Sequence, residues 1–423
     1  IIDQVELMNV DDECTDSLYF AEDKMTYRIQ KGKEGFVKSL ATYFPEEKTH
    51  LEEYLKAIFS ITDAVDLFNL RPTKDLFKVH SEDFLMPADD FVAKYISNTK
   101  LRSVLAYMNP LYGGRHDETP AFIHAIISAL YINGASRFVG GSDKFANLLV
   151  SVIQQAGGSV ITNDGVEWVE VNDRHVDFVR TRIGTEYRGD YYISAIHPCT
   201  LLKLMSENAF PKAYRNRLKA IPNAYSAFSA YIKLKPNTFP YINHSEYYMT
   251  RYDEMWNFGE HHDYWPLGFL FMTPPENHQG KYSTKVLITA PMLYDEVRRW
   301  ENTTVGHRGA DYEAWKEKMT KQLLERVEEM HPNFKECIDK VNASSPLTIR
   351  DFYGVKEGAL SGYSKDYKNM ALSQLPVVTK ISNLLLTGQN NNLHGFCGVP
   401  LTAISTAEAI LGRNYILNKL NQQ

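Results

Sequence analysis

An apolar run, a glycine-rich loop and a helical pattern follow one another near the C-terminus, and no other feature constrains this chain as strongly. Leu384 to Leu386 is a short continuous apolar run, which predicts a parallel strand covered on both faces. Gly388 ends this strand, at a point where the backbone must turn sharply or come close to a ligand. Gly395 and Gly398 follow, and Pro400 predicts the start of a helix, where a missing N–H costs nothing.

A helix that starts beside such a loop is either a ligand site or a plain crossover. Its free N–H groups and the positive end of its dipole favour a phosphate or another group that develops negative charge, such as the pyrimidine edge of a reduced flavin. An ordinary strand–loop–helix crossover explains the same spacing equally well. The spacing alone therefore leaves both interpretations open.

Three blocks of residues occur in an order that is typical of one enzyme family. The first, Thr387 to Gly412, reads TGQNNNLHGFCGVPLTAISTAEAILG. The second runs from Phe138 to Leu149 and is followed by Gly157-Gly158 and by Asp190 to Pro198, and the third is Ser345 to Arg350 with Gly354 and Gly358 behind it. Together they resemble the FAD-dependent family of phytoene desaturases, carotenoid isomerases and retinol 13,14-reductases (retinol saturases), and the first block is most similar to the retinol saturase branch.

The resemblance implies an α/β fold in which two domains are interleaved. A FAD/NAD(P)-binding Rossmann-like domain, with its N-terminal βαβ unit missing, is expected from residues 131–200 and 374–423. An α+β substrate-binding domain is expected from residues 1–130 and 201–373. The implied cofactor is FAD, with NAD(P)H as a candidate electron donor. The implied contacts to FAD are Gly140, Gly141, Val166, Gly388, Gln389, Gly395, Gly398, Val399 and Thr402.

One feature of the family is missing from this sequence. Its members begin with a strand, a GxGxxG turn and a helix that bind the ADP half of FAD, a unit of roughly 30 residues. No two of the 24 glycines of this chain stand in a G-x-G arrangement, and Ile1 to Leu7 resembles the region just after the unit. We expect a truncated sequence, because the second half of the flavin site has its glycines. The alternative is a family fold reused without this unit.

Three side chains of the implied site have two interpretations each. His394 is the candidate catalytic residue, since it lies in the loop expected to face the flavin ring and a histidine can deliver a proton to a double bond that is being reduced. Its alternative role is a hydrogen bond to the loop backbone. Gln389 stands where many relatives carry an acidic residue, although its amide can still bind the cofactor. The resemblance places Val166 beside the adenine, and its alternative is a core valine.

Composition excludes some classes of function. The formal net charge of −6, the pI near 6.1 and the lack of a dense basic run argue against a nucleic-acid partner. The four cysteines form no CxxC, and His261-His262 has no third ligand at a matching spacing, so we predict no metal site. No apolar run reaches the ~20 residues that span a bilayer. The expected location is cytoplasmic, with membrane association as the alternative.

Hydrophobic periodicity predicts a mixture of helices and strands. The expected helices cover 51–68, 119–130, 143–156 and 311–330, and the expected strands cover 159–162, 166–171, 175–181, 191–196 and 225–234. Aromatic residues are dense between Tyr241 and Phe271. Such residues either line a tunnel for an apolar substrate or pack in the core.

These observations predict a flavoprotein oxidoreductase that acts on the carbon–carbon double bonds of a long apolar polyene or isoprenoid, by saturation, desaturation or isomerisation. The expected partner is an apolar small molecule, collected through peripheral membrane contact. Two alternatives stay open: a non-catalytic binding protein for apolar ligands, and an amine oxidase of the same superfamily.

Overall fold

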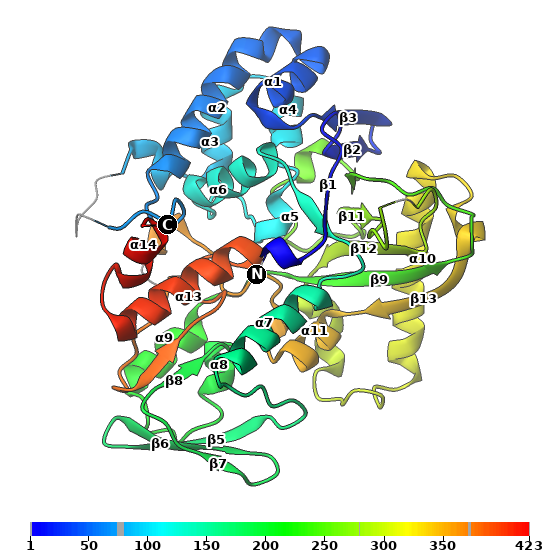
Figure 1. Ribbon diagram of the computed structural model, residues 1–423. Helices are drawn as coiled ribbons and strands as arrows, with labels where there is room; N and C mark the ends of the chain where they lie inside the picture. Colours follow the sequence, from blue (N-terminus) through cyan, green and yellow to red (C-terminus); the bar gives the residue numbers. More distant parts are fainter. Residues whose placement is uncertain (1, 74–79, 279, 371–373, 423) are drawn as a thin grey trace.

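A seven-stranded mixed sheet dominates the structure (Figure 1), a computed structural model that describes residues 2–73, 80–278, 280–370 and 374–422. The strand order is β13-β9-β12-β11-β10-β2-β3, and within this sheet only β10 and β2 are parallel. The strands are β2 (Asp16–Phe20), β3 (Met25–Ile29), β9 (Ser226–Leu234), β10 (Ser245–Met249), β11 (Gly268–Met272), β12 (Lys285–Met292) and β13 (Ile338–Ser344). The predicted strand over 225–234 is therefore confirmed.

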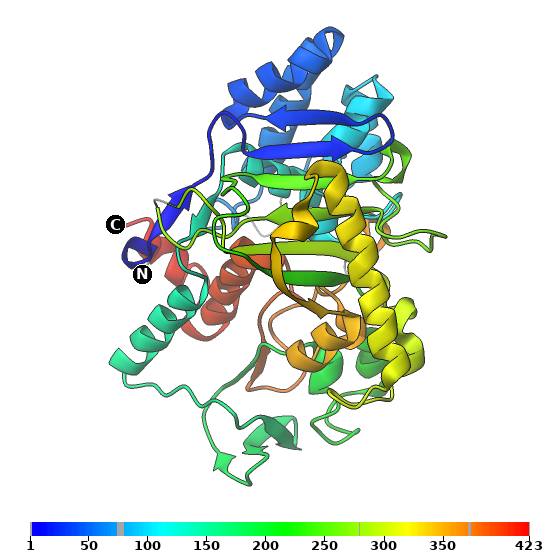
Figure 2. The same ribbon diagram turned by 90° about the vertical axis from the view of Figure 1, so that its right-hand side faces the viewer.

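Alternating side chains give this sheet two apolar faces. On β10, Tyr248 packs with Leu323 and Val327 of α10 (Ala310–Met330), which lies across the sheet in Figure 2. Tyr247 and Met249, pointing the other way, pack with a group of helices. These helices are α1 (Gly32–Tyr43), α2 (Lys48–Asp63), α3 (Ala88–Tyr95), α4 (Thr99–Leu105), α5 (Asn109–Tyr112) and α6 (Ala121–Ile132). The aromatic residues of 241–271 thus serve mainly as core packing.

A smaller part of the molecule, in the lower half of Figure 1, contains the C-terminal motif. Its sheets are the parallel pair of β8 (Tyr192–Ser194) with β14 (Leu384–Leu386) and the meander of β5 (Val166–Asn172), β6 (His175–Thr181) and β7 (Glu186–Tyr187). Its helices are α7 (Asp143–Gln155), α8 (Pro198–Leu201), α9 (Lys212–Ala220), α13 (Gly395–Leu411) and α14 (Tyr415–Leu420). A short pair, β1 (Leu7–Asn9) with β4 (Ser136–Phe138), joins the N-terminal segment to α7. The 3₁₀ turns are η1 (Ile2–Gln4), η2 (Pro45–Glu47), η3 (Glu82–Phe84), η4 (Tyr252–Glu254), η5 (Tyr294–Trp300), η6 (Phe334–Cys337), η7 (Lys356–Gly358) and η8 (Tyr367–Asn369).

Two sequence-based predictions about elements are wrong. Helix α13 begins at Gly395, with His394 as its N-cap, so Pro400 lies inside the helix instead of opening it. The cost is limited to the carbonyl of Phe396, which loses the N–H that another residue at 400 would supply, and Phe396 is exposed to solvent. Residues 159–162 form no strand, because no neighbouring strand lies beside them to share backbone hydrogen bonds among the described residues.

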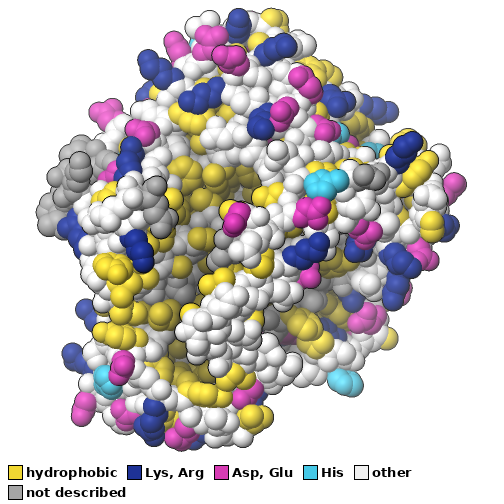
Figure 3. All heavy atoms as spheres, viewed as in Figure 1, with side chains coloured by type: hydrophobic (Ala, Val, Ile, Leu, Met, Phe, Trp, Pro, Cys, Tyr) yellow, Lys and Arg dark blue, Asp and Glu magenta, His cyan; other side chains and the backbone are white. Residues whose placement is uncertain are grey.

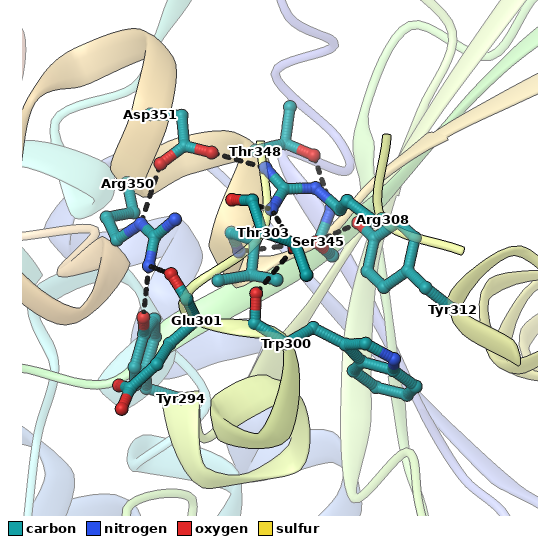
Figure 4. A network of polar contacts seen from close by, with 11 residues as sticks. Tyr294, Trp300, Glu301, Thr303, Arg308, Tyr312, Ser345, Thr348, Arg350 and Asp351 are labelled. Atoms are coloured by element: carbon teal, nitrogen blue, oxygen red, sulfur yellow. Dashed lines mark hydrogen bonds and ion pairs between the residues drawn. The ribbon is translucent and has the colours of Figure 1, made fainter. Parts of the chain in front are cut away.

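The third sequence motif has a structural role. Ser345 and Thr348 form a capping box at the start of α11 (Pro346–Tyr353). Arg350 Nη1 donates to Tyr294 Oη (2.8 Å) and to the Glu301 carbonyl (2.7 Å), while Asp351 bridges Arg350 and Arg308 (Figure 4). This network ties α11 to η5 and so fixes the turn that contains Gly354 and Gly358.

Candidate functional site

The carboxyl ends of β8 and β14 lie side by side and carry polar side chains without partners. Thr387 N donates to the Ser194 carbonyl (2.9 Å), which aligns the two strand ends. Ser194 Oγ and Thr387 Oγ1 are buried, and neither has a hydrogen-bond partner among the described residues. Ligands of parallel α/β sheets bind beyond the carboxyl ends of the strands. Because a buried hydroxyl without a partner is costly, these two point to a ligand at this edge.

The loop after β14 adds a third buried polar atom without a hydrogen-bond partner. Gly388 has φ +93°, and a Cβ there would lie 3.4 Å from the Ala195 carbonyl oxygen. Asn390 is buried, and its Oδ1 has no hydrogen-bond partner within the described ranges. A Cβ at Gly362 would lie 2.8 Å from this oxygen. The glycines therefore let two backbone segments approach a set of unsatisfied polar atoms.

The two glycines at the start of α13 differ in their surroundings. Gly395 has φ +73°, and a Cβ there would meet nothing within 4 Å, so its surroundings are open. Gly398 is buried, and a Cβ there would lie 2.4 Å from the Leu393 carbonyl carbon. The glycine at 398 is thus required by packing against Leu393, which the sequence did not predict. Val399 is exposed, whereas Thr402 is buried and its Oγ1 donates to the Gly398 carbonyl (3.1 Å).

Gly140 and Gly141 lie at the start of α7 with φ +80° and +117°. On either side of them, the rings of Phe138 and Phe145 contact Phe396 of α13, with centroids 5.5 Å and 5.0 Å away. The structure thus brings the second sequence block next to the C-terminal motif. Two helix starts, those of α7 and α13, converge here.

Gln389 lies in the loop that carries the unpartnered polar atoms, whereas Val166 lies in a separate sheet. Gln389 is half-buried in the same loop as Gly388 and Asn390. Val166 begins β5, pairs with Thr181 and is exposed, which excludes the core-valine interpretation. It lies in the separate three-stranded sheet, and its role beside an adenine stays a prediction.

His394 is held by a backbone hydrogen bond. Its Nε2 lies 2.8 Å from the Leu111 carbonyl oxygen of α5, so Nε2 carries the proton and donates it. Burial, with a smaller contribution from the charge of nearby Lys365, lowers the pKa of His394 to about 4. The imidazole is therefore neutral near pH 7, with its one N–H already engaged. Burial also lowers the pKa of Lys365 to about 8.

The residues present fit the flavin cofactor that the resemblance implies. Unpartnered polar atoms of Ser194, Thr387 and Asn390 can hydrogen-bond to polyol, phosphate or ring groups. The start of α13 supplies free N–H groups and a positive dipole end, at a glycine with open space around it.

An apolar face beside this edge is left uncovered by the described residues. Helix α7 is amphipathic but has no buried residue, and Leu149, Val152 and Ile153 are 40%, 42% and 44% exposed. Ile193 of β8 and Phe396 of α13 are exposed as well. Figure 3 shows hydrophobic side chains gathered around a hollow in this face of the molecule. Exposed apolar side chains gathered on one face are typical of a binding surface.

Solved structures with a similar fold are oxidoreductases. An oxidoreductase from Methanosarcina mazei matches with a TM-score of 0.61 at 13% identity, covering 96% of this chain and 83% of that chain. Cyclohexylamine oxidase from Brevibacterium oxydans matches with a TM-score of 0.57 at 13% identity, covering 99% and 83%. These likenesses confirm the predicted class, an α/β fold of the FAD/NAD(P)-binding Rossmann-like type.

Relatives found by sequence indicate a narrower group of proteins within this fold. All-trans-retinol 13,14-reductase of Danio rerio is 25% identical over 93% of this chain and 71% of the relative. The 4,4'-diaponeurosporene oxygenase of Staphylococcus aureus is 23% identical over 85% and 73%, and prolycopene isomerase 1 of an Oncidium hybrid is 19% identical over 87% and 64%. No family model matches the chain. The relatives confirm the resemblance to the phytoene desaturase and retinol saturase family.

Three residues of this site were missed in the sequence. Ser194, Thr387 and Asn390 were not predicted as contacts, although Ser194 ends β8 and the other two follow the buried strand β14. A polar residue directly after such a strand is the signal that could have found Thr387. Whether a hydroxyl has a partner, however, depends on neighbours that are distant in sequence.

Proposed function

We propose that this chain is an FAD-dependent oxidoreductase acting on the carbon–carbon double bonds of a long apolar polyene or isoprenoid. The observation that carries the proposal is the group of unpartnered polar atoms at the ends of β8 and β14, next to the start of α13. The relatives support the substrate class, since their names describe retinol and carotenoid enzymes. Saturation is the favoured direction, because the retinol reductases match with higher identity than the isomerase.

In this proposal FAD supplies the hydride, and the protein supplies placement, charge and exclusion of water. Ser194, Thr387 and Asn390 hydrogen-bond to the cofactor. The positive end of α13 favours negative charge that develops on the ring. His394, as candidate catalytic residue, orients the loop through Leu111. A proton from its Nε2 would require breaking that bond, so the geometry favours the positioning role.

The uncovered face of α7, β8 and α13 supports the proposal of a dinucleotide-binding unit. Strand β8 pairs only with β14 among the described strands, and an apolar strand beside its open edge would cover Ile193. We propose that a unit with GxGxxG packs here and binds the ADP half of FAD. The domain division at 131–200 and 374–423 against 1–130 and 201–373 belongs to this proposal; residues 1, 74–79, 279, 371–373 and 423 lie outside the described residues.

Substrate delivery and the electron donor are further parts of the proposal. No helix among the described residues is both long and apolar enough to cross a membrane. A water-insoluble polyene is instead collected by peripheral contact of an apolar patch with a bilayer. NAD(P)H is the proposed electron donor. Binding to liposomes in a flotation assay is expected, and a protein that stays wholly in the aqueous fraction would argue for a smaller, soluble substrate.

The reaction can be tested on a flavin-containing longer form of the protein. The bound flavin is reduced with dithionite under nitrogen and mixed with an all-trans polyene alcohol, and the product mass is measured. Addition of one hydride and one proton gives a product two mass units heavier. An unchanged mass with a new absorption spectrum indicates isomerisation. A parallel sample with the flavin left oxidised tests desaturation, which would reduce the flavin and give a product two units lighter. An unaltered substrate beside flavin that reoxidises only with oxygen would contradict the proposal.

A further inference from the structure

A large pocket lies between α8 and α9 on one side and η5, α11 and η7 on the other. Its volume is about 1000 Å³, at the upper end of the ~300–1000 Å³ that is typical of small-molecule sites. Ser194, Thr387 and Asn390 are not among the described residues of its wall. A ligand bound here would therefore be separate from the proposed flavin.

Positive side chains outnumber negative ones in the wall of this pocket, where six are cationic and four are acidic. Its three arginines already have carboxylate partners: Arg215 pairs with Glu207 (3.7 Å), Arg298 with Glu301 (3.9 Å) and Arg350 with Asp351 (2.6 Å; Figure 4). The three lysines, Lys203, Lys219 and Lys356, form no ion pair within the described ranges. The fourth carboxylate, that of Glu357, accepts a hydrogen bond from Asn223 Nδ2 (3.0 Å). The pocket thus has an excess of positive charge that comes from its lysines.

The lysines and the apolar side chains lie at different depths of the pocket. Lys356 is half-buried, and the other two lysines are exposed. Lys356 Nζ donates to the Lys219 carbonyl (3.1 Å), which ties η7 to α9 and keeps the lysines on one side. Met205, Tyr294 and Val355 line the same pocket but are buried. The pocket therefore has an apolar floor and a cationic rim.

This arrangement fits a ligand that has a flat apolar ring and several negative charges. A nucleotide combines the two, because its base can pack on the apolar floor while its phosphates reach the lysines, which bind phosphate as point charges. The buried floor is out of reach of a flat bilayer surface. We propose that the pocket binds a nucleotide with two or more phosphates, and that Lys203, Lys219 and Lys356 hold the phosphates. The inference goes beyond the proposed function, which makes no use of this pocket.

The test titrates three probes calorimetrically into the 423-residue chain and its variants at low ionic strength. ADP carries a base and two phosphates, adenosine carries only the base, and inorganic pyrophosphate carries only the phosphates. Lys203→Gln and Lys219→Gln each remove one positive charge from the rim. Lys212→Gln is the control, because Lys212 is exposed on the same helix as Lys219 but does not line the pocket. Glu207→Gln removes the carboxylate that pairs with Arg215.

The expected result is one bound ADP per chain, with a higher affinity than either adenosine or pyrophosphate, since each of these meets only part of the pocket. Lys203→Gln and Lys219→Gln each weaken ADP binding roughly 3- to 10-fold, as expected for one lost hydrogen bond, and Lys212→Gln leaves it unchanged. Glu207→Gln strengthens ADP binding, because it removes a negative charge from the wall.

Three results would overturn parts of the proposal. Equal ADP affinities of the two rim variants and Lys212→Gln would overturn the assignment of the pocket, and weaker binding in Glu207→Gln would contradict an anionic ligand. Adenosine that binds as tightly as ADP would overturn the role of the phosphates, and pyrophosphate that binds as tightly as ADP would overturn the role of the apolar floor. All titrations are independent of flavin, so failure of the proposed function does not affect them.

Discussion

At the residue scale, His394 can be tested as a positioning group. Glutamine has a side-chain N–H that can donate to the Leu111 carbonyl, and alanine has none. We expect His394→Gln to retain most flavin binding and turnover, and His394→Ala to lose turnover. An acid role predicts instead that both variants lose about 10²–10⁴-fold and that the alkaline limb of the pH–rate profile disappears in both, because a general acid must be protonated to act. The measurement is kcat against pH for the two variants.

Buried histidines make the stability of the molecule sensitive to acid. His124 is fully buried, with Tyr54 Oη 2.7 Å from Nε2 and Tyr112 Oη 2.9 Å from Nδ1, and burial lowers its pKa to about 4. The unfolded chain binds a proton near pH 6.5, and the folded chain only near pH 4, so stability falls as the pH falls through this window. The loss for one such group is about 2 kcal/mol between pH 7.5 and 5.

The variant His124→Gln isolates this contribution. Its free energy of unfolding should be lower than that of the wild type at pH 7.5 but should decrease by about 2 kcal/mol less between pH 7.5 and 5. Burial also lowers the pKa of His197 to about 4, whereas it raises the pKa of Asp16 to about 6, and both effects are common to the two proteins. Urea unfolding at several pH values gives the difference. Parallel pH curves for variant and wild type would show that His124 takes up its proton in the folded state.

At the element scale, the start of α13 depends on Gly398. An alanine Cβ there would lie 2.4 Å from the Leu393 carbonyl carbon, so Gly398→Ala should cost about 1–3 kcal/mol of stability by overpacking. Gly157→Ala is the comparison, because its φ of +85° is unsuited to alanine although nothing lies within 4 Å, whereas Gly398 is a helical glycine with a close contact and no positive φ. Gly157→Ala should cost only about 1–2 kcal/mol from backbone strain. Flavin lost without a larger loss of stability in Gly398→Ala would mean that Gly398 faces the cofactor instead.

The apolar face of α7 gives a prediction that depends on what covers it. Leu149 is 40% exposed, so Leu149→Gln should change the free energy of unfolding of this chain by less than about 0.5 kcal/mol. In a longer form in which a dinucleotide-binding unit packs on α7, the same substitution should cost about 1–3 kcal/mol. Chemical unfolding of both forms compares the two. Equal effects in both would show that nothing of the chain packs on this face.

Helices and strands that are determined by residues within or next to them could be predicted from the sequence. Leu384 to Leu386 form a strand because an apolar run between two buried faces has few alternatives, and α7 runs close to its predicted 143–156 because Gly157 ends it. The start of α13 could not be predicted from Pro400, since the hydrogen bonds of the preceding turn compensate for one missing N–H. The prediction of a strand over 159–162 was wrong because a strand needs backbone hydrogen bonds to a partner that is distant in sequence.

At the scale of the whole molecule, FAD affinity should depend on both halves of the flavin site. The 423-residue chain holds the edge at β8, β14 and α13 but no GxGxxG helix start, where the pyrophosphate is expected to bind. We expect weak or no FAD binding by this chain and stoichiometric binding by a longer form with that unit. Tight binding by the 423-residue chain would show that the strand edge supplies most of the affinity.

The most direct test of the flavin site is the FAD dissociation constant of Thr387→Val in the longer form. This variant removes a buried hydroxyl that has no partner among the described residues, so stability should not fall. FAD should bind about 3- to 10-fold more weakly, as expected for one lost hydrogen bond. The control is Thr406→Val, whose hydroxyl donates to the Leu386 carbonyl (3.0 Å) and should affect stability instead. Unchanged FAD affinity in Thr387→Val, with the fold intact, would contradict a flavin site at the ends of β8 and β14.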